Sequence, residues 1–160
     1  MSRRGLAPLF LLLAGVVLAG EPGRLEAQTP AEDLVLQEKA EPYMAFADQI
    51  VAALRAGQSG AFRASLSPTL LASTTKEELD AFVDRQVIPF FADYATPGEE
   101  QWVAPTTHPA GLTGFAFFRS FTASDGTEKP FVLYLLEEDG RLVVGNLLVG
   151  RSFQDMHPQQ

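Results

Sequence analysis

Residues 130–149 read PFVLYLLEEDGRLVVGNLLV, two apolar runs on either side of an Asp-Gly pair. The first run contains Phe, Val and Tyr, and the second contains three Val, all of them residue types that favour β-strands. Asp139-Gly140 is a strong short-range signal for a tight hairpin turn. The stretch therefore predicts two antiparallel strands. For a two-residue turn, the predicted cross-strand pairs are Glu138 with Arg141, Leu135 with Val144, Tyr134 with Gly145, and Leu133 with Asn146.

A second hairpin is predicted directly upstream. Residues 114–121 read GFAFFRSF and are followed by another Asp-Gly pair, Asp125-Gly126. A two-residue turn at this pair would set Arg119 opposite Val132 and Phe117 opposite Tyr134. With one more strand before it, the predicted sheet is a four-stranded antiparallel meander. The predicted strands are 101–107, 112–123, 130–138 and 141–152.

Both faces of this predicted sheet are apolar. Alternation along the strands gives one face with Phe115, Phe117, Arg119, Phe121, Val132, Tyr134, Leu136, Val143 and Leu147. The other face carries Phe118, Phe131, Leu133, Leu135, Val144, Asn146 and Leu148. A sheet with one face in water would alternate apolar with polar residues, so this one needs a cover on each side. Helices can cover one face. The first short helix or a second copy of the chain must cover the other, and we expect a homodimer packed through the sheet.

The region before the strands predicts helices. Thr29-Pro30-Ala31-Glu32 has a threonine cap, a first-turn proline and a glutamate three residues after the cap, which together indicate a helix start. This helix is predicted to be short and to end at Pro42. A second helix, with apolar residues at spacings of three and four, is predicted to run from there to Gly57. Residues 58–73 suit a short helix and a loop.

A further helix is predicted from Thr75-Lys76-Glu77-Glu78, which has the same capping signature. Its apolar spacing continues for nearly twenty residues. Pro89 should kink it, because the ring lacks an amide proton and crowds the carbonyl of Arg85. Thr96-Pro97-Gly98 is predicted to end it. The fold class is therefore α+β, with N-terminal helices packed on a curved four-stranded sheet.

The first residues have the composition of an export signal. Ser2-Arg3-Arg4 is a positive start, Leu6 to Leu18 is almost wholly apolar, and a small residue follows. A helix of about fourteen residues would rise only about 21 Å, short of the roughly 30 Å hydrocarbon core, so no stable membrane span is expected. Cleavage after Ala19 or after Ala27 remains open. We expect an exported protein, periplasmic or secreted, with a processed leader at 1–27, one α+β domain at 28–153 and a loose polar tail at 154–160.

Composition excludes several classes of site. The formal net charge of −8 at pH 7 disfavours nucleic acid and anionic membranes as partners, since both attract clustered Lys and Arg. The chain has no cysteine, and its two histidines, His108 and His157, each precede a proline. A zinc or iron site built on thiolate or imidazole is therefore not expected. We predict no metal and no cofactor.

The order of helices followed by a meander, with the stretches GFAFFRSF and PFVLYLLEEDGRLVVGNLLV, resembles the nuclear transport factor 2-like (cystatin-like) superfamily. The resemblance covers roughly residues 42–153. It implies a curved sheet that wraps a kinked helix to form a cone. The superfamily includes ketosteroid isomerases, dehydratases, small-ligand binders and non-enzymatic partners, so the resemblance leaves function open.

Arg119 is the most anomalous residue in the predicted sheet, because its neighbours on the same face are phenylalanines. A lone buried guanidinium costs several kcal/mol, so Arg119 needs a partner. In a structural interpretation it pairs with a carboxylate such as Asp93 or reaches water at the end of the sheet. In a functional interpretation it anchors an anionic or carbonyl-bearing ligand in an apolar pocket. The other candidate ligand contacts, each of which could equally be a packing residue, are Tyr134, Asn146, Trp102 and Tyr43.

An enzyme would need a carboxylate base in an apolar cavity and a donor that stabilises oxygen. Asp48, Asp93, Tyr43 and Tyr94 could be recruited, and His108 could act as a base. However, Asp48 lies opposite the apolar stripe of its helix, and phosphate-loop and nucleophile-elbow motifs are absent. The sequence favours a non-catalytic binding or accessory protein for a small apolar or anionic ligand or another protein. The alternatives are a cofactor-free isomerase, dehydratase or hydrolase, and an interaction partner whose cone is filled by its own phenylalanines.

Overall fold

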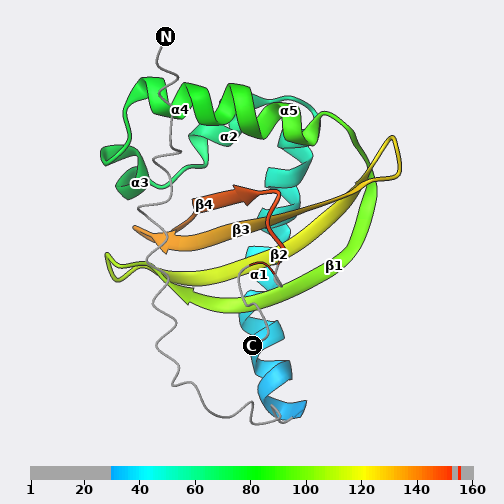
Figure 1. The fold of residues 1–160 in the computed structure, drawn as a ribbon. Helices are drawn as coiled ribbons and strands as arrows, with labels where there is room; N and C mark the ends of the chain where they lie inside the picture. The colour runs from blue at the N-terminus through cyan, green and yellow to red at the C-terminus, as the bar shows by residue number, and fades with distance from the viewer. Residues whose placement is uncertain (1–29, 153–154, 156–160) are drawn as a thin grey trace.

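The computed structural model describes residues 30–152 and residue 155, and within them the chain is α+β (Figure 1). The helices are α1 (Pro30–Arg55), α2 (Ser59–Ala64), α3 (Pro68–Ala72), α4 (Lys76–Phe82), the π-helical turn η2 (Val83–Val87) and α5 (Ile88–Phe91). The strands are β1 (Tyr94–Thr107), β2 (Thr113–Ala123), β3 (Glu128–Glu138) and β4 (Arg141–Val149). They form a curved antiparallel sheet in the order β1-β2-β3-β4, as predicted. The predicted export signal, both cleavage positions and most of the predicted tail lie outside the described residues.

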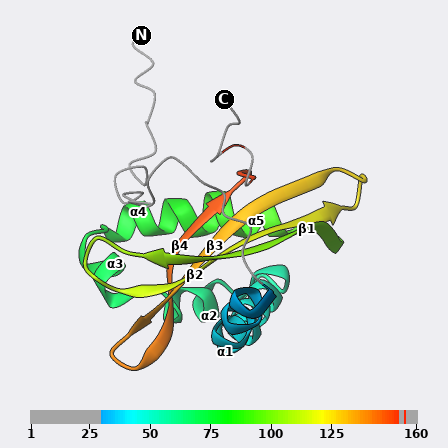
Figure 2. The same ribbon diagram turned by 90° about the horizontal axis from the view of Figure 1, so that it is seen from below.

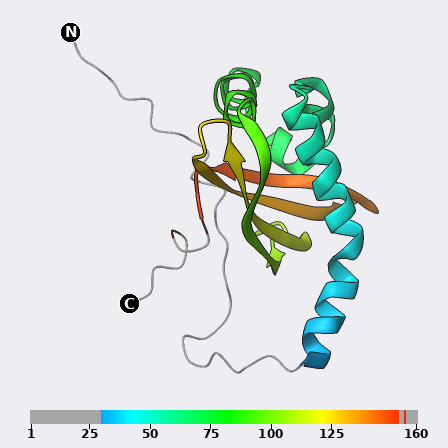
Figure 3. The same ribbon diagram turned by 90° about the vertical axis from the view of Figure 1, so that its right-hand side faces the viewer.

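Helix α1 continues through Pro42, so the prediction of two helices separated at this residue is wrong. Pro42 cannot donate to the carbonyl of Glu38, but both residues are exposed, so water can satisfy that carbonyl. The helix lies along one side of the sheet (Figures 2 and 3), and its N-terminal end extends beyond the strands, where Leu34 and Val35 are exposed. This segment is continuous with the rest of α1 and does not cover the opposite face of the sheet.

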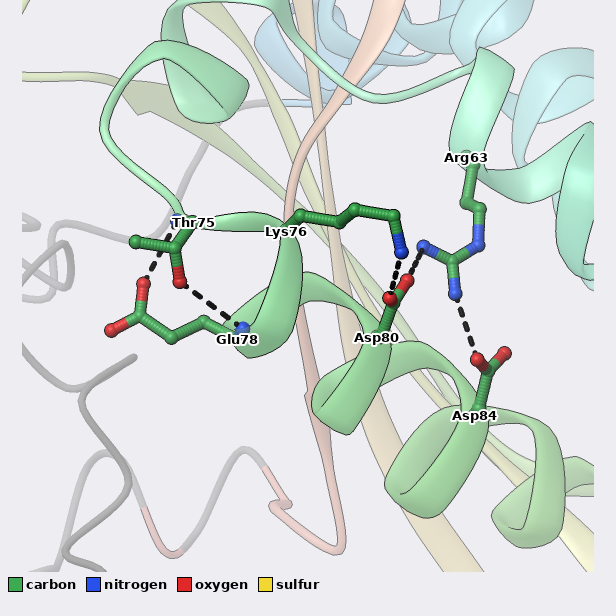
Figure 4. Close-up of polar contacts among 6 residues, drawn as sticks. All are labelled: Arg63, Thr75, Lys76, Glu78, Asp80 and Asp84. Carbon is green, nitrogen blue, oxygen red and sulfur yellow. Dashed lines mark hydrogen bonds and ion pairs between the residues drawn. The ribbon is translucent and has the colours of Figure 1, made fainter.

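The capping signature at Thr75 is confirmed. Thr75 Oγ1 accepts from the Glu78 amide at 3.2 Å, and the Thr75 amide donates to the Glu78 carboxylate at 2.9 Å (Figure 4). Farther along, the disturbance predicted for Pro89 takes the form of the π-helical turn η2, just before the proline. The helical region ends at Phe91 and β1 begins at Tyr94, so Thr96-Pro97-Gly98 lies in a strand and does not end the helix as predicted.

Ion pairs hold α2 against the helical turns that follow α3. Arg63 contacts Asp80 at 2.7 Å and Asp84 at 3.0 Å, and Lys76 also pairs with Asp80 (Figure 4). The guanidinium can serve both carboxylates because it presents donors on more than one nitrogen. These contacts fix the helices relative to one another above the sheet.

The β3–β4 hairpin follows the predicted register only near its turn. Asp139 and Gly140 have φ values of 52° and 73°, as a two-residue type I′ turn requires, and Leu135 pairs with Val144 as predicted. A register shift then occurs at Gly145. The predicted pairs of Tyr134 with Gly145 and of Leu133 with Asn146 are wrong, and the observed pairs are Tyr134 with Asn146 and Leu133 with Leu147. A Cβ on residue 145 would lie 2.4 Å from Cδ1 of Leu136, so the missing side chain makes room for that neighbour.

The β2–β3 hairpin has a three-residue loop and not the predicted two-residue turn. The Ala123 amide donates to the Thr127 carbonyl at 2.8 Å, and Gly126 has a φ of 85°. This is the common three-residue loop that ends in a left-handed glycine. The pairing is one residue away from the prediction: Arg119 is opposite Phe131, and Phe117 is opposite Leu133. The shift moves the apolar residues of β3 to the other face relative to β2.

The face toward the helices forms the helix-side core, which contains buried residues from every helix and from β2, β3 and β4. Its largest fully buried side chains are Phe62, Phe91, Phe117, Phe121 and Phe131. The opposite face has its own buried cluster, which we call the strand-only cluster: Ala116, Phe118, Val132 and Tyr134, with Ala104 and Leu148 packed against it. The prediction that both faces are apolar is confirmed, although the membership of each face differs from the prediction.

Candidate functional site

The candidate residues lie on opposite sides of the sheet. Arg119 and Tyr43 are on the helix side, where each contacts α1 or belongs to it. Trp102 is opposite Phe118, and Asn146 is opposite Tyr134, which places all of them on the face with the strand-only cluster. The shared face predicted for Arg119 and Tyr134 is therefore not formed.

Arg119 has a protein partner. Its Nη1 donates to Oδ1 of Asp48 on α1 at 2.7 Å, and its guanidinium carbon lies 5.5 Å from the centre of the Phe117 ring. The Arg119 side chain is 17% exposed, whereas that of Asp48 is 69% exposed. The stem of the arginine thus packs on the sheet and its head meets a surface carboxylate. This agrees with the structural interpretation of Arg119, but the predicted example of a partner, Asp93, instead pairs with Lys129 at 3.2 Å.

Tyr43 packs against the sheet from α1. Its ring lies edge-on to Phe115 with ring centres 4.9 Å apart. Burial raises the pKa of its phenol above the ordinary value, and the charge of Glu137 adds to the same effect. The hydroxyl is therefore neutral at physiological pH and available only as a neutral donor or acceptor.

The opposite face brings three candidates together in one group of neighbouring residues, in which Phe118 and Tyr134 are buried. We call this group the strand-face patch: Trp102, Ala104, Phe118, Tyr134, Asn146 and Leu148. Trp102 is 63% exposed and lies on β1 beside Phe118. Asn146 Oδ1 accepts from the amide of Leu147 at 2.8 Å. Burial raises the pKa of Tyr134, so this phenol also stays neutral.

The strand-face patch is uncharged. On β2, β3 and β4, charged side chains of this face occur only toward the strand ends, at Glu128, Glu138 and Arg141. Glu128 lies toward one end of this face, where its carboxylate accepts a hydrogen bond from the Ser120 hydroxyl at 2.5 Å. The patch can therefore offer apolar contact and neutral hydrogen bonds, but it has no acid or base of its own.

The residues that could have formed a catalytic site are dispersed. Tyr94 stacks on Phe121, with Arg55 4.2 Å from the centre of its ring. His108 Nδ1 accepts from the Ala110 amide at 3.1 Å in the β1–β2 loop. Asp48 pairs with Arg119, but its side chain is largely exposed and not in the apolar cavity that a carboxylate base would need.

Within the part of the chain that the structure describes, no three His, Asp or Glu side chains are grouped so that they could hold a metal ion. None of the helices in that part combines the length and the apolar character needed to cross a bilayer.

One buried polar cluster was not predicted from the sequence. Glu138 binds Ser67 and Thr69, and both Glu138 and Ser67 are buried. The Ser67-Pro68 pair is a helix-start signature that could have indicated this site, since a capped helix start attracts a carboxylate.

Comparisons of this chain with protein-family models, with curated proteins and with solved structures find no match. Its function therefore has to be argued from its own residues.

Proposed function

We propose that this chain is an exported, non-catalytic binding or accessory protein that acts through the strand-face patch. The single observation that carries the proposal is the contrast between an interior filled with aromatic rings and an outer face on which Trp102 is 63% exposed beside the buried strand-only cluster. We also propose membership of the nuclear transport factor 2-like superfamily, and a periplasmic or secreted location on the basis of the predicted export signal.

The packing of the helix side supports binding on the outside and not in a cone. Phe91 lies 5.5 Å from Phe121 and 5.0 Å from Phe131, measured between ring centres, and the rings of Phe90 and Tyr94 also contact Phe121. Aromatic pairs at these distances are in direct contact and fill the space that a ligand would need. The proposal thus combines the binding hypothesis with the alternative in which phenylalanines fill the cone.

Charge supports a second copy of the chain as the partner. With a net charge of −8, two copies repel each other over most of their surfaces. An uncharged patch is the surface on which they can meet without burying carboxylates. A two-fold dimer would bring the same patch together from both copies, and tryptophan is enriched among the residues that contribute most to such interfaces.

Trp102 allows a direct test because it is the only tryptophan of the chain. We expect the purified protein to have a dimer mass by light scattering at micromolar concentration. Its tryptophan emission should shift to shorter wavelength as the concentration rises, because Trp102 loses contact with water. The substitution Trp102→Glu should give a folded monomer, since it places two carboxylates at the interface.

Met44→Glu is the matched control, because Met44 is also an exposed apolar residue, at 40%, but lies on α1. This variant should remain dimeric. A monomeric wild type at micromolar concentration, or a Trp102→Glu variant that remains dimeric, would contradict the dimer. Native mass spectrometry of protein from an exporting host adds an independent check, because a small molecule retained in the interior would contradict the proposed outer binding surface.

A further inference from the structure

Residues 65–67 lie along the outer edge of β4 and lead directly into α3, and we call residues 65–72 the strap. Leu66 forms an isolated parallel bridge with Val144. The Val144 amide donates to the Ser65 carbonyl at 2.7 Å, and the Ser67 amide donates to the Val144 carbonyl at 2.9 Å. An edge strand otherwise presents unpaired backbone groups to other chains. The strap therefore covers part of an edge that could pair with another strand.

Glu138, at the end of β3, is hydrogen-bonded to two residues of the strap. Its carboxylate accepts hydrogen bonds from the Ser67 hydroxyl, from the Thr69 amide at 3.1 Å and from the Thr69 hydroxyl at 2.6 Å. Glu138 is 7% exposed and Ser67 is 2% exposed. One buried carboxylate thus joins the β3–β4 hairpin to the start of α3, with bonds strengthened by its charge.

The arrangement depends on Glu138 being ionised. Ser67 Oγ accepts from the Leu70 amide at 3.3 Å and uses its own proton for Glu138. A proton on the carboxylate would set two donors against each other at Ser67 and would leave weaker neutral bonds to Thr69.

The surrounding groups favour the ionised form. The hydrogen bonds from Ser67 and then Thr69 hold the pKa of Glu138 below its ordinary value of 4.5, and His108 of the β1–β2 loop adds a smaller effect of the same sign. Arg141 is the cross-strand partner of Glu138 in the hairpin, and Asp139 follows it in the turn. A group with a lowered pKa stabilises the fold fully above its ordinary pKa, and this contribution is lost as the pH falls through the folded value.

We propose that Glu138 is an acid-sensitive latch, which keeps the strap on the edge of β4 at neutral pH and releases it in acid while α1 and β2 stay folded. Release uncovers the Val144 backbone and the apolar side chains of Leu66 and Leu70, which the closed strap buries. For a protein with a predicted export signal, the device would couple an open sheet edge to the acidity of its surroundings.

Hydrogen exchange of the purified protein, followed by mass spectrometry, tests the latch. Glu138→Gln keeps the shape of the side chain but removes its charge. At pH 7 it should raise exchange in peptides covering residues 65–72 and Val144 roughly tenfold, because weaker neutral hydrogen bonds replace the charge-assisted ones. Exchange in α1 and β2 should stay unchanged. Glu137→Gln is the matched control, because Glu137 is the exposed neighbour on the other face and should leave the strap protected.

The pH dependence separates the latch from a simple structural contact. After correction for intrinsic rates, the difference between wild type and Glu138→Gln should persist at neutral pH and disappear as the pH falls through the lowered pKa of Glu138, because the wild type then loses the same charge. If Glu138→Gln unfolds as a whole, Thr69→Val supplies the test, since it removes a donor to the carboxylate. That variant should shift strap opening to higher pH. Equal strap protection in wild type and Glu138→Gln at pH 7, or a pH-independent difference between them, would overturn the proposal.

Discussion

The two faces of the sheet are both apolar but are built in different ways. On the helix side, rings from α5, β2 and β3 meet, and every helix adds buried side chains to the same core. On the other side, the described members of the buried cluster are all strand residues. Strand β2 contributes to both, with Phe117 and Phe121 on the helix side and Phe118 on the other. An apolar strand pattern therefore indicates that a face is to be covered, but not by what.

The largest effect should come from the helix side. Phe121→Ala removes a fully buried ring that contacts Phe90, Phe91, Phe131 and Tyr94. We expect the free energy of unfolding to fall by about 3–5 kcal/mol, because both burial and packing are lost. Urea denaturation followed by circular dichroism measures it. A loss below about 1 kcal/mol would mean that the ring cluster is not the centre of the core.

The same substitution on the other face of β2 should cost less. Among the described residues, the cluster around Phe118 receives apolar side chains from strands only. Phe118→Ala should lower the free energy of unfolding by about 2 kcal/mol, in line with the loss of one buried aromatic side chain without a large helix-lined cavity. If Phe118→Ala costs as much as Phe121→Ala under the same conditions, the two faces contribute equally and the contrast between them is wrong.

The smallest effect concerns the rim of the helix side, where Arg119 meets Asp48. A double-mutant cycle with Arg119→Met and Asp48→Asn should give a coupling energy of about 0.2–1 kcal/mol, because the carboxylate is largely exposed and water screens the pair. The coupling should decrease in high salt. A coupling above about 2 kcal/mol would show instead that the pair is an internal part of the helix-side core.

Local signals in the sequence predicted much of the fold. The Asp139-Gly140 turn and the Thr75 capping box depend on neighbouring residues, and both were correct. The strand order was also correct. Pro42 was misjudged because the cost of a proline within a helix depends on whether the freed carbonyl reaches water, which tertiary structure decides. The extra residue in the β2–β3 loop was missed because an Asp-Gly pair is compatible with loops of either length.

The candidate site was harder to predict than the fold. The predicted β2–β3 register was wrong by one residue, so the prediction placed Tyr134 on the same face as Arg119. The shift at Gly145 was not predicted, so Asn146 was placed on the face opposite Tyr134, whereas the two residues are paired. Glu138 was missed because its partners, Ser67 and Thr69, are about seventy residues earlier in the chain. Long-range hydrogen bonds of this kind leave no periodic signal in the sequence.

The π-helical turn η2 changes the direction in which the side chains before Pro89 point. In a regular α-helix each residue advances about 100°, so Phe91, eight residues after Val83, would point about 80° away from it. A wider turn advances less per residue. The smaller rotation per residue brings Phe91 closer to the direction of Val83. Three residues, Val83, Val87 and Phe91, are all completely buried in the same core. The wider turn thus keeps the apolar side chains before and after Pro89 on the same side of the helix, the side that faces the sheet.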